Sequence, residues 1–147
     1  MIRLRPVDKY NFVRVLKLEL AKEQEDFVTS NAFSLSQAYV MPECRPFALY
    51  SGMDPVGFVM YTLDEDDREY WIYRLMIDRR EQRKGYGREG LRETLKQIRR
   101  EAPDRKVVYI SVDPANTVAR RLYESEGFVP DGRVVDGEDV LMYTYAD

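Results

Sequence analysis

A short segment, Gln82-Arg83-Lys84-Gly85-Tyr86-Gly87, combines residue types that together bind an anionic group. It stands where a β-rich run ends and a helical pattern begins. The first turn of a helix leaves backbone N–H groups unpaired at the positive end of the helix dipole. Gly85 and Gly87 carry no Cβ, so a phosphate can approach this backbone closely. Arg88 follows directly, and Arg79 and Arg80 lie just upstream. The segment predicts a pyrophosphate site; the alternative is a solvated basic helix start whose glycines only let the chain turn.

The same glycines also match a different nucleotide motif. Gly85, Gly87 and Gly90 have the spacing of the dinucleotide fingerprint, and Asp113 follows the next predicted strand, about where a ribose-binding acid would lie. A doubly wound dinucleotide domain, however, begins with this motif and needs several further βα units. Here much of the chain precedes the motif and too little follows it, so position disfavours this alternative.

The composition restricts the chemistry that the chain can perform. None of the 147 residues is His, which excludes the Ser-His-Asp triad, the Cys-His pair and His-containing zinc sites. The acid or base must then be Asp, Glu, Tyr, Lys, Cys or a terminus. The formal net charge of -3 and the sequence pI of about 5.2 offer no cationic field for nucleic acid, so a small cationic molecule is the more natural partner. Cys44 is the single cysteine and is expected to be packed rather than reactive.

Hydrophobic spacing indicates the elements that must position these residues. Strands are predicted over residues 2–7, 47–50, 56–63, 70–77, 107–112, 128–129 and 140–145. Helices are predicted from an Asp8 N-cap as far as Leu20, within residues 23–39, from Gly87 to just before Pro103, and over residues 116–125. The run 107–112 is nearly continuous in apolar residues, as expected for a strand covered on both faces. We find no membrane-spanning run and no signal-peptide pattern, so the chain is expected to be one cytoplasmic domain.

Two motifs in this order resemble the GNAT acyltransferase superfamily. Gln82 to Gly87 resembles its Gln/Arg-x-x-Gly-x-Gly/Ala signature, and residues 116–128 resemble its second motif. The resemblance implies an α/β (α+β) fold over residues 1–147, with a central mixed, twisted sheet and helices on both faces. It also implies acetyl-CoA as co-substrate and no metal. The backbone of residues 75–77 would pair with the pantetheine like an added strand, and residues 83–88 would take the pyrophosphate. The cofactor-binding residues implied are Leu75, Met76, Ile77, Gln82, Arg83, Lys84, Gly85, Tyr86, Gly87, Arg88, Asn116 and Arg120.

Tyr123 is the candidate catalytic acid. One face of the predicted helix carries Asn116, Ala119 or Arg120, and Tyr123. Side chains on this face can contact a single ligand. Acetyl transfer from a thioester to an amine releases a thiolate that must be protonated, and a Tyr with a pKa near 10 holds its proton at pH 7. The alternative is an aromatic side chain that only packs between helix and sheet. Within the superfamily resemblance we favour the catalytic role.

The base that removes the amine proton is left open. Many members of the superfamily place a Glu on the central strand, but the inward positions here are expected to be Trp71, Tyr73 and Leu75. Glu69 at the strand's start, and a water chain to the acidic loop of residues 64–67, are equal candidates.

The acceptor is predicted to be a polyamine. Residues 24–28 and 70–78 resemble the bacterial spermine/spermidine acetyltransferase branch, and carboxylates with aromatic faces would suit several ammonium groups. The candidate acceptor residues are Glu25, Asp26, Glu43 and Tyr73, together with residues 64–67. The alternatives are an acetyltransferase for a protein amine or another small amine, and a non-catalytic acyl-CoA binding module. An edge strand at residues 140–145 would allow a homodimer; no nucleic-acid or membrane partner is expected.

Overall fold

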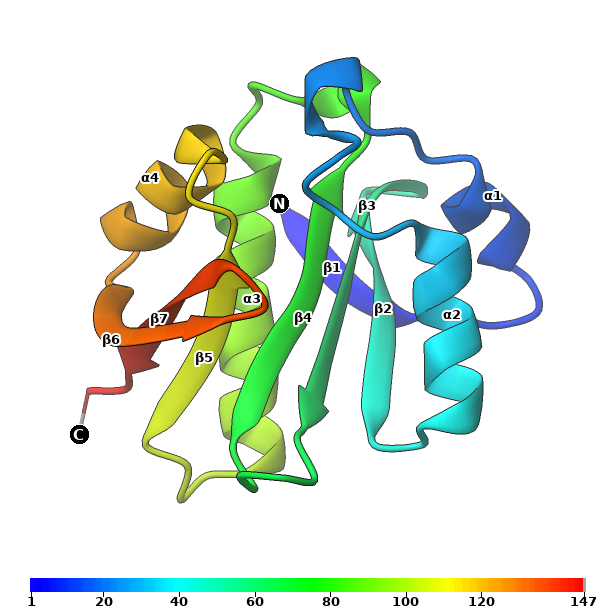
Figure 1. The fold of residues 1–147 in the computed structure, drawn as a ribbon. Coiled ribbons are helices and arrows are strands. Elements are labelled where there is room, and N and C mark those ends of the chain that lie inside the picture. Colours follow the sequence, from blue (N-terminus) through cyan, green and yellow to red (C-terminus); the bar gives the residue numbers. More distant parts are fainter. Residues whose placement is uncertain (147) are drawn as a thin grey trace.

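Seven strands form one mixed sheet in the computed structural model, which describes residues 1–146 (Figure 1). The strand order is β1-β2-β3-β4-β5-β7-β6. Strands β4 and β5 pair in parallel, and the other neighbouring strands pair antiparallel. The strands are β1 (Ile2–Pro6), β2 (Cys44–Ser51), β3 (Asp54–Leu63), β4 (Tyr70–Ile77), β5 (Val107–Val112), β6 (Val129–Val135) and β7 (Glu138–Thr144).

Helices cover both faces of this sheet, as the sequence predicts. They are α1 (Phe12–Leu16), α2 (Asn31–Val40), α3 (Tyr86–Glu101) and α4 (Thr117–Ser125), with 3-10 turns η1 (Lys22–Gln24) and η2 (Arg79–Glu81). One core cluster joins α3 and α4 to the sheet, and a second joins α1 and α2 to the opposite face (Figure 1). The expected mixed sheet between helical layers is confirmed. No helix within residues 1–146 is long and apolar enough to cross a membrane.

Helix α3 follows directly from its apolar spacing. Leu91, Leu95 and Ile98 recur at helical intervals, and all three are buried against the sheet. The helix ends at Glu101, two residues before Pro103, which cannot continue it. This anchored helix holds the turn 82–87 at one end of β4.

Strands β4 and β5 separate part of the way along their length. Their pairing runs from Tyr70 opposite Val108 to Ile72 opposite Ile110. Beyond Ile72, the β5-facing edge of β4 has no strand beside it within the described residues. The backbone of residues 73–77 therefore has an open edge to which an extended ligand can add.

A β-bulge at Tyr73 changes which residues share a face of β4. Met60 of β3 lies opposite Arg74, whereas Tyr61 lies opposite Ile72, so Tyr73 is the extra residue. Consequently Leu75 packs on the α3 side and Tyr73 on the α2 side. The expectation that Trp71, Tyr73 and Leu75 face the same way is wrong, because the bulge breaks the simple alternation.

The first helix is shorter than predicted and begins later. The Asp8 side chain accepts hydrogen bonds from the N–H groups of Tyr10 and Asn11, so it closes the turn before the helix, and α1 starts at Phe12. The helix ends at Leu16 and does not reach Leu20. Glu19 instead donates its N–H to the carboxylate of Asp78 at 2.8 Å. This contact with the end of β4 competes successfully with a further helical turn.

Two expectations about the other strands are also corrected. In β5, Val108, Ile110 and Val112 are buried, whereas the alternating residues Val107, Tyr109 and Ser111 are only half-buried. One face of β5 is therefore incompletely covered, and this face forms part of the site. The segment 140–145 is not an edge, because β7 lies between β5 and β6. The edge at this end of the sheet is β6.

Candidate active site

The turn that leads into α3 has an unusual backbone for which one glycine is required. Gly85 is the N-cap of α3 with φ of 82°, and Arg83 also has a positive φ of 67°. A Cβ at Gly85 would meet nothing within 4 Å, so conformation rather than lack of room favours glycine. A Cβ at Gly87 would lie 3.4 Å from the Leu122 side chain of α4, which is an ordinary van der Waals contact. Residues 83–85 are exposed, which leaves the first turn of α3 accessible to an anionic group.

The cationic side chains around this turn are mostly paired. Lys84 Nζ lies 2.7 Å from the Glu81 carboxylate, and Arg88 lies 2.8 Å from Glu126. Arg83 is exposed beside them. Because two of the predicted countercharges are already neutralised by carboxylates, the backbone N–H groups and the helix dipole are the main positive partners of a bound phosphate.

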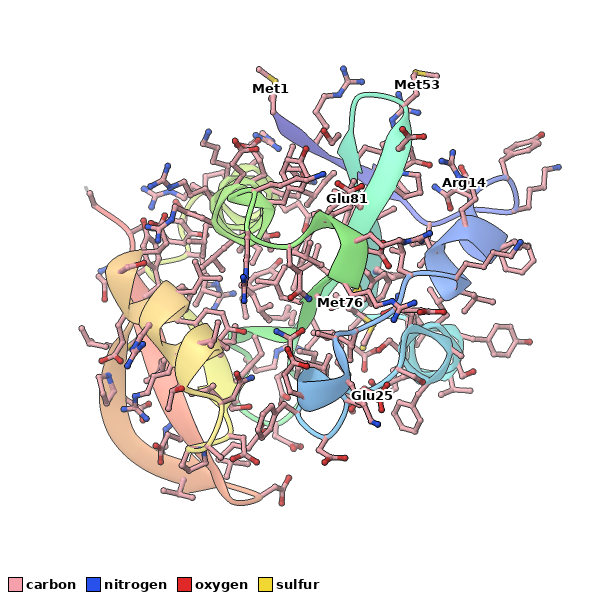
Figure 2. All side chains as sticks on the ribbon, turned by 90° about the horizontal axis from the view of Figure 1, so that it is seen from above. Met1, Arg14, Glu25, Met53, Met76 and Glu81 are labelled. Carbon is pink, nitrogen blue, oxygen red and sulfur yellow. The ribbon has the colours of Figure 1, made fainter. Side chains whose placement is uncertain are left out.

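Gln82 and Tyr86 fasten the turn to its surroundings. Gln82 Nε2 donates to Gln24 Oε1 at 2.8 Å and to the backbone oxygen of Ile77 at 3.1 Å. The Tyr86 hydroxyl accepts a hydrogen bond from Ser51 at 3.3 Å. Figure 2 shows that the segments bearing Glu25 and Glu81 lie at the same end of the molecule. In this structure Gln82 therefore ties the η1 segment to the end of β4.

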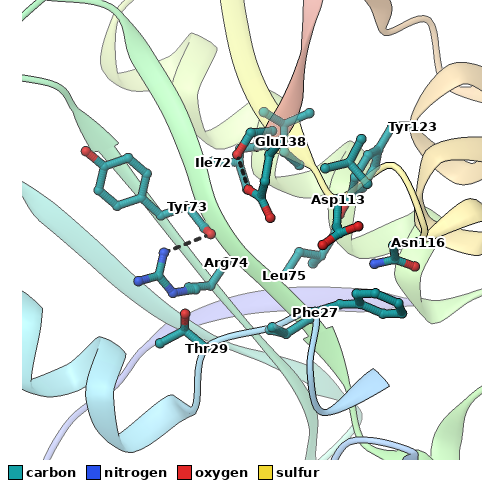
Figure 3. A pocket seen from close by; sticks show the side chains of 14 residues that line it. Phe27, Thr29, Ile72, Tyr73, Arg74, Leu75, Asp113, Asn116, Tyr123 and Glu138 are labelled. Carbon is teal, nitrogen blue, oxygen red and sulfur yellow. Dashed lines mark hydrogen bonds between the residues drawn. The ribbon is translucent and has the colours of Figure 1, made fainter. Parts of the chain in front are cut away.

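A cavity of about 100 Å³ lies where β4 and β5 separate (Figure 3). Its walls come from residues 72–75 of β4, residues 110–112 of β5 and Asp113 that follows it, residues 27–29, and Asn116, Tyr123 and Glu138. The open edge of β4 borders this cavity. A ligand added along that edge would place one end among these side chains.

Tyr123 is buried on the cavity wall. Burial, with a contribution from the negative charge of Glu138, raises the pKa of Tyr123 to about 12, so the phenol keeps its proton at neutral pH. Asn116 caps α4 by accepting a hydrogen bond from the N–H of Ala119 at 3.4 Å, and it lines the same cavity. Arg120 instead binds Asp139 at 2.6 Å. Tyr123 and Asn116 thus meet at one cavity, while the charge of Arg120 is engaged elsewhere.

Glu138 is a cavity residue that the sequence reasoning missed. It begins β7, and its carboxylate accepts a hydrogen bond from Ser111 Oγ at 2.7 Å. The preceding Asp136 and Gly137 both have positive φ, 50° and 79°, as in a type I′ hairpin turn. The Asp-Gly pair was the available signal, since it fixes the register in which Val135 lies opposite Glu138. Glu138 and Asp113 line the same cavity, so two carboxylates share it with the Tyr123 phenol.

Arg74 is the cation of the cavity wall. It donates to the backbone oxygen of Tyr73 at 3.0 Å and to Gln37 Oε1 at 3.1 Å. Its Nε is buried and has no hydrogen-bond partner among the described residues. Burial lowers the pKa of Arg74 from its ordinary value, and the negative charge of Glu138 is one of the influences that oppose this shift. The cavity therefore presents charges of both signs.

The four predicted acceptor residues do not converge on this cavity. Glu25 and Asp26 are exposed, and it is their neighbours, residues 27–29, that line the cavity. Glu43 lies in the connection before β2, and its buried Oε1 has no hydrogen-bond partner within residues 1–146. Tyr73 contributes to the wall, but its hydroxyl donates to Asp64 at 2.7 Å, and the ring points away from Tyr123 (Figure 3).

The two bases considered from the sequence lie in different surroundings. Glu69 lines a separate hollow and contacts Arg105 at 3.4 Å. In the acidic loop, Asp64 accepts from Tyr73, and Asp67 accepts from the Trp71 indole at 2.8 Å. Glu138, unlike either of these candidates, lines the cavity that also contains Tyr123. Within residues 1–146, no cluster of three or more acidic or thiol side chains is arranged to hold a metal ion.

Known proteins resemble this chain in sequence and in fold. The chain is 32% identical over 148 aligned residues to the spermine/spermidine N(1)-acetyltransferase of Bacillus subtilis, covering 96% of this chain and 97% of that protein. A spermidine N-acetyltransferase from Vibrio cholerae, solved with CoA and spermine, superimposes with a TM-score of 0.75 at 18% identity, covering 97% and 95% of the two chains. An aminoglycoside acetyltransferase solved with coenzyme A superimposes with a TM-score of 0.79 at 16% identity, covering 98% and 95%.

The match extends to a described protein family. Residues 12–128 match the Acetyltransferase (GNAT) family, and this stretch includes the turn before α3, the separated strands and Tyr123. Together with the full-length relative and the shared fold, the match establishes that this chain belongs to the GNAT family of acetyltransferases.

Proposed function

We propose that this chain transfers an acetyl group from acetyl-CoA to a primary amine of a polyamine, such as spermidine or spermine, by direct attack in a ternary complex. The observation that carries the proposal is that a protonated phenol, Tyr123, and a carboxylate, Glu138, face one cavity at the open edge of β4. One group can supply a proton and the other can receive one. Acyl transfer from a thioester to an amine needs both a proton donor for the leaving thiolate and a proton acceptor for the amine.

The donor half of the site is proposed from the backbone. The pantetheine would pair with the free edge of β4 at Leu75, Met76 and Ile77, and the pyrophosphate would lie on the first turn of α3. Figure 3 supports this path, since Leu75 lies at the cavity between Tyr123 and Arg74. The thioester would then reach the cavity, and the rest of the cofactor would remain at the exposed turn.

The acceptor must lose protons to react. A Lys-like ammonium with a pKa near 10.4 is neutral about once in 2,500 at pH 7, which costs about 4.6 kcal/mol. Glu138 would take this proton, so that the nitrogen lone pair attacks the thioester carbonyl carbon. As the C–S bond breaks, the electron pair leaves on sulfur, and Tyr123 would protonate the thiolate. The ammonium group loses two protons in all. The first passes through Glu138 to solvent, and the second, lost after the attack, restores the proton that Tyr123 gives to sulfur.

Burial affects both partners of the second proton transfer. The raised pKa of Tyr123 makes it a weaker acid than an exposed Tyr. The thiolate would form in the same desolvated cavity, where burial raises the pKa of a thiol as well. The two shifts act in the same direction, so the raised pKa of the thiol offsets part of the acidity that Tyr123 loses by burial.

Three considerations support a polyamine as the acceptor. Glu138 and Asp113 provide negative charge at the cavity, which favours an ammonium group. The full-length relative at 32% identity bears the name spermine/spermidine N(1)-acetyltransferase. The chain's formal net charge of -3 also favours a cation over an anion in the encounter.

A second candidate acceptor is an amine that also carries a carboxylate, and Arg74 is the observation that favours it. A half-buried guanidinium with an unpaired Nε repels a polycation but would bind a carboxylate. The two candidates predict opposite consequences of removing the Arg74 charge.

The release of free CoA with a panel of acceptors tests the proposal. The panel contains spermidine, spermine, a lysine peptide, an aminoglycoside and an amino acid with a side-chain amine. We expect the highest kcat/KM with spermidine or spermine. Preference for the amino acid would favour the second candidate, and preference for the peptide or the aminoglycoside would reject both. Tight CoA binding without CoA release from acetyl-CoA with any amine would identify a non-catalytic binding module.

A further inference from the structure

We propose a second cation site, formed by Trp71 and Tyr109, that binds an ammonium of the acceptor remote from the one acetylated. The inference rests on the proposed function, because it concerns a polyamine substrate. In the present structure the site is covered by the chain's own Arg133. The guanidinium therefore marks the position of a cation and competes with the substrate for it.

The two rings form a built platform. Trp71 of β4 and Tyr109 of β5 lie opposite each other in the parallel ladder, and their rings stack with centroids 5.1 Å apart. The Arg133 guanidinium carbon lies 5.5 Å from the Trp71 centroid and 4.8 Å from that of Tyr109. A cation over two aromatic faces at these distances is attracted by both ring quadrupoles. The chemistry of the platform is thus already shown by the group that occupies it.

Carboxylates complete the cation site. Asp67 accepts the hydrogen bond of the Trp71 indole at 2.8 Å, and its charge also acts on Arg133. Asp131 binds the Arg133 side chain at 2.7 Å. A polyamine ammonium would find the same partners as the guanidinium: two ring faces and nearby negative charge. A neutral or anionic group would find none of these advantages.

Arg133 is placed where it can be displaced. Its side chain is 46% exposed, and it belongs to β6, the edge strand of the sheet. The pairing of β6 with β7 is interrupted between Pro130 and Val134, which is the stretch that carries Arg133. Arg133 is therefore held by its side-chain contacts and by its backbone N–H, which donates to Asp131 at 2.9 Å, rather than by a continuous ladder.

The site is one short step from Glu138. Tyr109 and Ser111 alternate with buried residues and share the incompletely covered face of β5. Two strand residues span about 6.6 Å, and Ser111 holds Glu138 at 2.7 Å. A spacer of three or four methylene groups, as in spermidine and spermine, bridges a distance of this order. With the reacting amine at Glu138, the next ammonium would reach the two rings.

Trp71 itself reports on the site, because it is the single tryptophan of the chain. The first experiment titrates the intrinsic fluorescence with spermine and with butylamine, without acetyl-CoA. In Arg133→Ala, spermine is expected to give a saturable change at about five- to tenfold lower concentration than in the wild type. Butylamine, with one ammonium, should give the same weak response in both proteins. Arg100→Ala removes an equal charge from the exposed end of α3 and should behave as the wild type.

The second experiment measures acetylation. Trp71→Leu is expected to raise the KM for spermine about three- to tenfold and to leave the KM for butylamine unchanged. If Arg133→Ala does not fold, Trp71→Leu still tests the cation site. Equal spermine titrations in wild type and Arg133→Ala, or equal KM changes for spermine and butylamine in Trp71→Leu, would overturn the inference. Saturable spermine binding without acetylation of any amine would instead overturn the proposed function and leave the cation site standing.

Discussion

The Glu138 carboxylate accepts a 2.7 Å hydrogen bond from Ser111 Oγ, which fixes it on the wall that it shares with Tyr123. Ser111 belongs to β5 and Glu138 to β7, and these two strands pair directly. This contact engages Oε1 of Glu138; in the proposed mechanism the other oxygen, Oε2, would meet the amine. A carboxylate held in this way is suited to receive a proton at a defined position.

Replacement of Glu138 by Gln should impair amine activation. We expect kcat/KM for spermidine to fall about 100-fold at pH 7, because the proton acceptor is lost. The affinity for acetyl-CoA, measured by calorimetry, should remain within about twofold of the wild type. An acceptor amine that is already neutral at pH 7 should recover most of the lost rate. Glu93→Gln, on the surface of α3, is the matched control and should leave both quantities unchanged; an equal loss there, or no rescue by the neutral amine, contradicts the role.

Tyr123→Phe should reduce turnover and also change the pH dependence of stability. The folded state keeps the Tyr123 proton up to a pKa of about 12, whereas an unfolded Tyr ionises near 10. Between these values the unfolded state binds fewer protons, so stability falls as the pH rises. For this one residue the loss amounts to about 3 kcal/mol once the pH exceeds the folded pKa. Urea unfolding from pH 9 to 12 should therefore show that the free energy of unfolding declines less steeply with pH in Tyr123→Phe than in the wild type. If the two proteins lose stability in parallel, the raised pKa of Tyr123 is refuted.

Arg74→Met separates the two candidate acceptors. For a polyamine, removal of a like charge from the cavity wall should raise kcat/KM by about two- to tenfold. For an amine that carries a carboxylate, the same change should lower it by at least about tenfold. The substitution removes the hydrogen bonds to Tyr73 and Gln37, but it also relieves the cost of burying a guanidinium whose Nε has no partner among the described residues. The free energy of unfolding should therefore change by less than about 1 kcal/mol. A fall in activity with spermine would argue against the polyamine.

Gly85→Ala tests the phosphate-binding turn, and Gly52→Ala is its control. Both glycines have positive φ, 82° and 62°, and an added Cβ at either would meet nothing within 4 Å. Each substitution should cost about 1–2 kcal/mol of stability from backbone strain alone. Only Gly85→Ala should weaken CoA binding, since Gly52 lies in the β2–β3 turn. Equal CoA affinities in the two variants would show that the turn at residues 82–87 does not bind the cofactor.

Much of the fold was accessible from local sequence pattern. Strand β4 spans the predicted residues 70–77, and the buried stripe of α3 is the predicted one. Periodicity suffices where one face of an element is buried. It failed at Tyr73, because a bulge depends on the pairing with β3, and at Leu20, because the contact between Glu19 and Asp78 lies outside any local window.

The site was less accessible than the fold. Tyr123 and Asn116 could be grouped because they lie on one helix face, whereas Glu138 reaches the cavity only through the order β5-β7-β6. Glu25 and Asp26 are near each other in sequence, but their side chains are exposed and do not line this cavity. The geometry of separate strands determines which carboxylate meets the phenol.

The most direct test of the central claim is a mass-spectrometric assay with acetyl-CoA and spermidine, comparing the wild type with the Tyr123→Phe/Glu138→Gln double variant. The wild type should convert spermidine to a product heavier by one acetyl group, with an equal amount of CoA released. The double variant should bind CoA but form product at no more than about one-thousandth of that rate. Product formation by the double variant at the wild-type rate, or no acetylated spermidine with the wild type, would contradict the account.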